Sequence, residues 1–189
     1  MTRSNSELRS PALAARYLPD LPLPPYAYLP GRFPHPTRDA GGHHESDVIA
    51  SATCSATAVW RDNRPYLRGI DLFNHGYYWE AHEAWEQAWH ACGRRGVTGD
   101  LLRGLIHLAG AGFATRRGKP SGRRRHAVLA HALFERAGEC LSGDRTRSLG
   151  LAPTALQTLA ERIVNGDALT VFSDEAPVAV VFDASLCPD

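Results

Sequence analysis

Residues 77–89 constrain the fold of this chain more than any other segment. They hold three tryptophans, two tyrosines, three glutamates and one histidine. At the helical step of 100° per residue, Tyr77, Ala81 and Trp85 fall on one face, while Glu80 and Glu83 turn toward the opposite, polar face. We therefore predict a helix from about Tyr77 to Cys92, with an aromatic seam toward the core and an acidic ridge beside it.

Apolar residues at helical spacing predict four more helices, at about 65–73, 100–117, 122–141 and 153–165. The helix at 100–117 has a broad apolar face and small residues opposite, so we place it at the centre. We expect the next helix to bury a stripe of apolar residues, namely Leu129, Ala130, Leu133, Phe134, Ala137 and Leu141. The last helix starts at Pro153 and stops at Gly166. The fold class we expect is all-α, a single bundle of about five helices.

Seven prolines between Tyr17 and Thr37 rule out regular elements there. We predict that residues 1–60 form a proline-rich, mostly irregular N-terminal arm, ordered where its aromatic residues find a groove; a flexible tail is the alternative. Residues 61–143 would form the helical core. Residues 144–189 would form a C-terminal helix and a short tail, with the strand-like run 178–182 lacking a partner strand.

Composition excludes several classes of protein. The 189 residues carry a formal net charge of +1, so no global field directs the chain to nucleic acid or to a membrane. No segment reads as a signal peptide or a membrane span, and the four cysteines form no CxxC pair. We expect a cytoplasmic protein with free thiols.

One cluster of cations is the only candidate nucleic-acid patch, and binding there is not expected because no aromatic residue interleaves with it. Its members are Arg116, Arg117, Lys119, Arg123, Arg124 and Arg125.

Two motifs carry a family resemblance. They are Phe73-Asn74-x-Gly76-x-Tyr78-x-Glu80-Ala81-His82-Glu83-x-x-Glu86-x-x-Trp89 and Gly104-Leu105-Ile106-x-Leu108-Ala109. Over about residues 65–140 the chain resembles a bacterial and archaeal family of small helical proteins, domain of unknown function number 309. The resemblance implies an all-α bundle and a bacterial source, and it implies no reaction. That family more often has glutamine at position 107, which argues against His107 as an essential ligand.

His82, Glu83 and Glu86 are the candidate site residues. His82 and Glu86 lie one helical turn apart, so they can act as an acid–base pair or offer two ligands to one divalent transition metal. Glu83 would orient or assist, and hydrolysis is the reaction class we expect. The His-Glu-x-x-Glu string differs from the zinc-protease motif because Glu86 stands where that motif has its second histidine.

More ligands would have to come from elsewhere in the chain. The candidates are Asp71, His75, His107, His35, Asp39, His43 and His44.

The expected ligand pocket for a metal or a small polar ligand lies under aromatic residues beside this helix. Its residues would be Asn74, Tyr78, Trp79 and Trp89. Two alternatives remain open. The polar residues can be structural, satisfied within a helix interface. The chain can also be a non-catalytic module that uses the aromatic seam for a partner or for self-association as a homo-oligomer.

Overall fold

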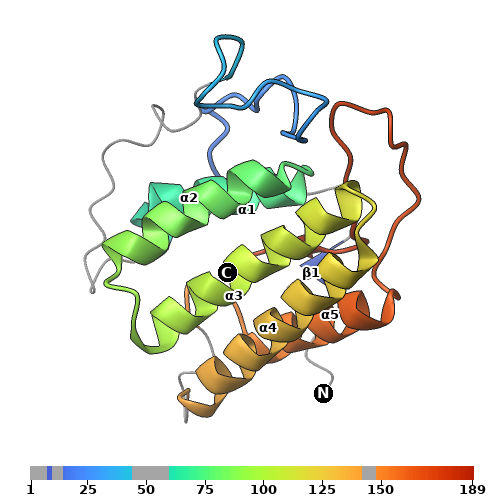
Figure 1. Cartoon of the computed structure of the whole chain (residues 1–189). Coiled ribbons are helices and arrows are strands. Elements are labelled where there is room, and N and C mark those ends of the chain that lie inside the picture. Colours follow the sequence, from blue (N-terminus) through green and yellow to red (C-terminus); the bar gives the residue numbers. More distant parts are fainter. Residues whose placement is uncertain (1–7, 10–14, 44–59, 142–147) are drawn as a thin grey trace.

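A bundle of five helices makes up most of the computed structural model, which describes residues 8–9, 15–43, 60–141 and 148–189. Figure 1 shows α3 running through the middle, with α1 and α2 on one side and α4 and α5 on the other. The helices are α1 (Arg64–Asn74), α2 (Tyr78–Ala91), α3 (Gly96–Arg116), α4 (Pro120–Glu139) and α5 (Pro153–Asn165). A short 3-10 helix, η3 (Trp60–Asp62), precedes them. The predicted all-α bundle is confirmed.

The small residues of α3 allow its neighbours to approach closely. A Cβ at Gly104 would lie 2.3 Å from the ring of Phe134 on α4, and a Cβ at Gly112 would lie 2.4 Å from the ring of Tyr78 on α2. These rings rest directly on the α3 backbone, so α3 is buried from both sides as its sequence predicts.

Two helix ends follow their sequence signals, one helix start differs, and one predicted core residue is exposed. Asn63 caps α1 by accepting from Tyr66 N at 3.1 Å, and Gly166 ends α5 in the left-handed conformation with φ +91°. However, α3 begins four residues earlier than expected, at Gly96. The predicted burial of Leu129 is wrong, because its side chain is 43% exposed. The other residues predicted for the core-facing stripe of α4 include Ala130, Leu133, Phe134 and Ala137, and these four are buried.

The described part of the N-terminal arm packs on the bundle. Leu18, Tyr26 and Leu29 are buried, and the ring of Tyr26 stacks on Phe33 at 5.0 Å. In Figure 1 this segment, drawn in blue, lies across the outer side of α1 and α2. Of the two possibilities that the sequence leaves open, an arm packed on the bundle is found over residues 15–43.

The two ends of the chain meet. Strand β1 (Leu8–Arg9) pairs antiparallel with β2 (Ser185–Leu186), and Ala27 N donates to Pro177 O at 3.0 Å. The run 178–182 forms a single bridge, between Leu169 and Phe182, rather than a strand. The C-terminal tail thus has a short partner strand that the sequence analysis did not expect. The division at residues 60 and 143 stays a prediction.

The structure also bears on two expectations from composition, that the thiols are free and that no segment spans a membrane. Cys140 and Cys187 are free thiols, but Cys92 is disulfide-bonded, so the prediction of free thiols is wrong at that position. Across the described residues, each helix is too short or too polar to serve as a membrane span.

Candidate functional site

Three side chains of α2 form a cluster at the surface. His82 Nδ1 lies 3.4 Å from Glu83 Oε1, and His82 Nε2 lies 4.0 Å from Glu86 Oε1. The three side chains are 33%, 46% and 43% exposed, in the order His82, Glu83 and Glu86. One ligand atom from each lies within 4.8 Å of the other two. The structure therefore brings the three predicted site residues together where solvent and ions can reach them.

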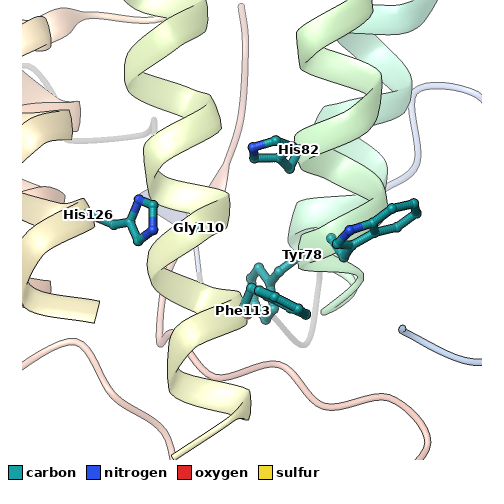
Figure 2. A pocket seen from close by; sticks show the side chains of 6 residues that line it. Tyr78, His82, Gly110, Phe113 and His126 are labelled. Atoms are coloured by element: carbon teal, nitrogen blue, oxygen red, sulfur yellow. The ribbon is translucent and has the colours of Figure 1, made fainter. Parts of the chain in front are cut away.

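A pocket of about 230 Å³ opens beside this cluster, and His82 is part of its wall. Figure 2 shows the imidazole of His82 pointing from α2 toward α3. Three helices supply the remaining lining, which is largely aromatic. The lining residues are Tyr78, Trp79, His82, Gly110, Phe113 and His126.

Two imidazoles meet at the α3–α4 side of the pocket. His107 Nδ1 and His126 Nδ1 lie 3.2 Å apart, so one ring donates a hydrogen bond to the other. Burial, followed by the charge of His126, lowers the pKa of His107 to about 4. Burial, followed by Arg125 and His82, lowers the pKa of His126. Burial therefore favours the neutral form of both rings, and of the two only His126 lines the pocket.

Of the four residues expected to line a ligand pocket, Tyr78 and Trp79 do so. Asn74 is buried elsewhere: its amide donates to Leu186 O and its carbonyl accepts from Leu186 N, at 2.8 and 2.7 Å. Trp89 is partly buried, stacks under the Arg94 guanidinium and is not part of the pocket wall. Asn74 therefore fixes the C-terminal tail, and Trp89 lies further along α2.

Glu80 is fully buried, although helical angles place it toward the polar face. Its Oε1 accepts from Tyr28 N at 2.8 Å and faces His43 Nε2 at 3.1 Å. The arm covers this side of α2. Glu80, which the sequence analysis placed on the polar face, therefore holds the arm in place. Helical periodicity cannot predict the contacts of Glu80 with Tyr28 and His43, because these residues are far apart in the chain.

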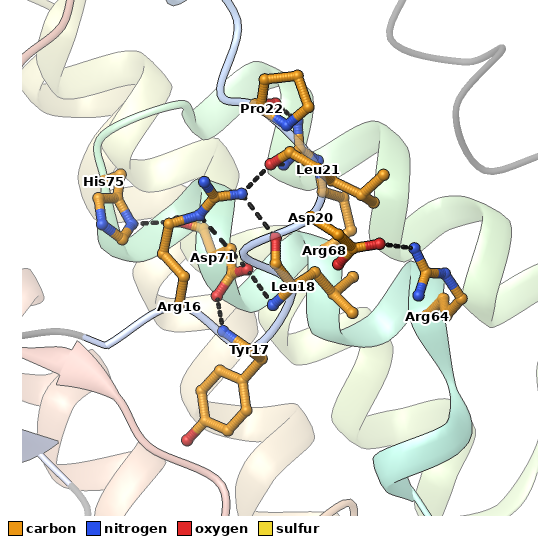
Figure 3. Close-up of polar contacts among 10 residues, drawn as sticks. All are labelled: Arg16, Tyr17, Leu18, Asp20, Leu21, Pro22, Arg64, Arg68, Asp71 and His75. Carbon is orange, nitrogen blue, oxygen red and sulfur yellow. Dashed lines mark hydrogen bonds and ion pairs between the residues drawn. The ribbon is translucent and has the colours of Figure 1, made fainter.

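Asp71 on α1 also holds the arm by accepting hydrogen bonds from its backbone, as Figure 3 shows. Its carboxylate accepts from Tyr17 N and Leu18 N at 2.7 and 2.8 Å. The adjacent His75 ring contacts the backbone carbonyl of Asp71 at 2.7 Å. Buried Arg68 donates to the carbonyls of Leu21 and Pro22 at 3.1 and 2.7 Å. Polar residues of α1 thus hold the backbone of the arm.

The other candidate metal ligands do not join the His82 cluster. His35 and Asp39 bond to each other within the arm, His43 faces Glu80, and His44 lies outside the described residues. Among the described residues, His82, Glu83 and Glu86 are the only group of three or more His, Cys, Asp or Glu side chains with ligand-like spacing. A metal bound there would take His82 and a carboxylate from the protein, and its other positions would be open.

A comparison with known protein families finds similarity in the part of the chain that holds the pocket. The sequence model of a family described as Domain of unknown function (DUF309) matches residues 66–126. Neither the curated proteins nor the solved structures give a match to the chain. The matched residues include the whole of α2 and α3 and the start of α4, and therefore every residue of the pocket wall. Over residues 66–126 the chain is thus similar to the DUF309 family.

Proposed function

We propose that this protein binds a divalent transition metal at His82 and Glu86, at the mouth of an aromatic pocket that takes a small ligand. The observation that carries the proposal is that His82 belongs to both features: it faces Glu86 and it lines the pocket. An imidazole with a carboxylate suits Zn²⁺ and its neighbours in the first transition row better than Ca²⁺, which prefers an all-oxygen shell.

The distances support a common ion. Two ligands of one tetrahedral zinc lie about 3.4 Å apart, given bonds of about 2.0–2.2 Å. His82 Nε2 and Glu86 Oε1 are 4.0 Å apart, and both side chains are partly exposed, so a small rotation would close the gap. His82 Nδ1 has no hydrogen-bond partner in the structure and lies 3.4 Å from Glu83 Oε1. With a small rotation of Glu83, this oxygen would accept the Nδ1 proton and hold the tautomer that leaves Nε2 free for the metal.

The pocket limits what could bind next to the ion. Its volume of about 230 Å³ is below the range common for drug-sized ligands, so a fragment-sized molecule fits better. Tyr78, Trp79 and Phe113 offer aromatic surface, while His126 offers a neutral polar group. The ligand class we propose is a small molecule with a flat apolar body and one or two polar atoms directed at the ion.

Hydrolysis is the reaction class that this arrangement would support. An ion with two protein ligands keeps water in its remaining positions, and the ion makes that water a stronger acid and a better source of hydroxide. A substrate in the pocket would lie beside that water. Hydrolysis of p-nitrophenyl acetate with and without Zn²⁺, compared between the wild type and His82→Ala, tests this extension separately from metal binding.

Metal titration of the untagged full chain tests the proposal. Isothermal titration with Zn²⁺ and elemental analysis after dialysis should give one ion per chain. His82→Ala and Glu86→Ala should each weaken binding at least about tenfold, since each removes one of two protein ligands. With only two such ligands, the wild-type affinity should be well below that of a structural zinc site.

His90→Ala is the matched control, because His90 is an exposed histidine on the same helix and faces Arg94 rather than a carboxylate. Equal zinc binding in His82→Ala and His90→Ala, with both variants folded, would refute the proposed site. Unchanged binding in Glu86→Ala would refute the proposed ligand pair.

The alternative, an interaction module built on the aromatic seam, has little surface available. Tyr77, Tyr78 and Trp85 are buried inside the chain. The exposed large apolar side chains of the described residues are Val128, Leu129 and Val171, none of which belongs to the seam. Light scattering on the full chain measures self-association directly.

A further inference from the structure

A buried arginine, Arg116, lies outside the His82 cluster and has hydrogen-bond donors that the structure leaves without an acceptor. Arg116 ends α3 and is only 7% exposed, yet two of its nitrogens have no hydrogen-bond partner. Its Nη2 donates to Ala176 O at 2.8 Å, while Nε and Nη1 are buried and bond to nothing in the structure. A charged donor buried in this way is unfavourable, because the water that it lost has not been replaced.

The surroundings of Arg116 do not neutralise it. Burial and the nearby Arg32 guanidinium lower the pKa of Arg116, whereas Tyr78 and Asp174 act in the opposite direction. No carboxylate in the described part of the chain forms an ion pair with Arg116. Arg32 itself donates to the backbone carbonyl of Asp174, so the arm and the C-terminal tail both close over the end of α3.

We propose that Arg116 and Arg32 form a binding site for a small oxyanion, a phosphate or a carboxylate, beneath the junction of the arm and the tail. The fork that a guanidinium presents to two oxygens of one anion is Nε with Nη2, and in Arg116 the Nη2 group already donates to Ala176 O. An anion would therefore accept a single charge-assisted hydrogen bond from the free Nε–H of Arg116, and it would reduce the repulsion between the two arginines. Neither arginine lines the pocket beside His82, so this site does not depend on the metal proposal.

The tail segment next to Arg116 is exposed to solvent on its outer side. Ser173, Asp174 and Glu175 are exposed, and Phe172, whose ring lies 5.9 Å from the Arg116 guanidinium, is only partly buried. A displacement of this tail segment would open the guanidinium to solvent while α3 stays in place.

Isothermal titration of the full chain with inorganic phosphate, and separately with acetate, tests the proposal. Sodium chloride at equal ionic strength controls for general screening. We expect saturable 1:1 binding of at least one anion, weakened at least about tenfold in Arg116→Met and several-fold in Arg32→Met. Which of the two anions binds, phosphate or acetate, distinguishes a phosphate site from a carboxylate site. Arg124→Met, which removes an exposed cation of the same basic cluster, should bind as the wild type does.

A spectroscopic measurement keeps the test valid if Arg116→Met does not fold. In a ¹H–¹⁵N spectrum of the wild type, the Arg116 Nε–H signal should shift on addition of the binding anion, and Arg32→Met should reduce that shift. Arg32 is exposed, so this variant should retain the fold. Binding no stronger than that of chloride for both anions, or equal binding in folded Arg116→Met, would overturn the proposal.

Discussion

Glu80 and His82 lie two residues apart on α2 and have opposite environments. Glu80 is fully buried under the arm, while His82 faces the pocket and the exposed carboxylates. Helical spacing correctly groups His82 with Glu86, because their proximity is set by the helix alone. The same spacing places Glu80 wrongly, because its burial depends on Tyr28 and His43, far away in the sequence.

Glu80→Ala should therefore destabilise the protein by about 1–3 kcal/mol, since it leaves the Tyr28 N–H, in a partly buried position, without its acceptor. Urea unfolding of the full chain measures the change. Glu83→Ala is the control, and because its side chain is 46% exposed its effect should stay within about 0.5 kcal/mol. Equal effects of the two substitutions would contradict the assignment of Glu80 as an anchor.

His107 should make stability depend on pH. Burial lowers its pKa from the ordinary value of 6.5 to about 4, so the folded chain favours the neutral ring. Between these two pH values the unfolded chain binds a proton that the folded chain excludes, and the free energy of unfolding must fall as the pH falls from 6.5 to 4. His107→Gln should flatten that decline, as seen in melting temperatures measured at pH 7 and pH 4.5. An unchanged decline would show that other groups cause it.

At the scale of elements, the sequence predicts the five helices well because apolar residues recur at helical spacing in each. Their contact geometry is predicted only where small residues mark a close approach, as on α3. Leu129 was misplaced because it lies at the edge of the buried stripe of α4, where spacing along the helix does not tell whether a neighbouring helix covers an apolar side chain.

Gly112→Ala tests the close contact of α2 and α3. The new methyl group would lie 2.4 Å from the Tyr78 ring, so one of the two helices must shift, and we expect a destabilisation of about 1–3 kcal/mol. Gly138→Ala is the control on α4, where the methyl group would meet Pro153 Cβ at an ordinary 3.5 Å. There the added helix propensity should leave stability unchanged or raise it by about 0.5–1 kcal/mol. Similar losses in both variants would contradict the packing described for α3.

For the whole molecule, the polar residues of the α1–α2 region divide into two groups. Asp71, Asn74 and Glu80 hold the backbone of the arm and the tail, and their role emerges only when both termini fold over the bundle. His82, Glu83 and Glu86 stay at the surface beside the pocket. The sequence could predict the second group from local spacing, but the first required contacts across more than fifty residues, which periodicity does not contain.

The location of a bound ion tests the central claim most directly. Crystals of the full chain grown with stoichiometric Zn²⁺, measured at the zinc absorption edge, should show one anomalous peak about 2.0–2.2 Å from His82 Nε2 and a Glu86 oxygen. Glu83 should contact Nδ1 and not the ion. A peak held by other residues, or no peak at the His82 cluster although zinc is bound in solution, would contradict the account.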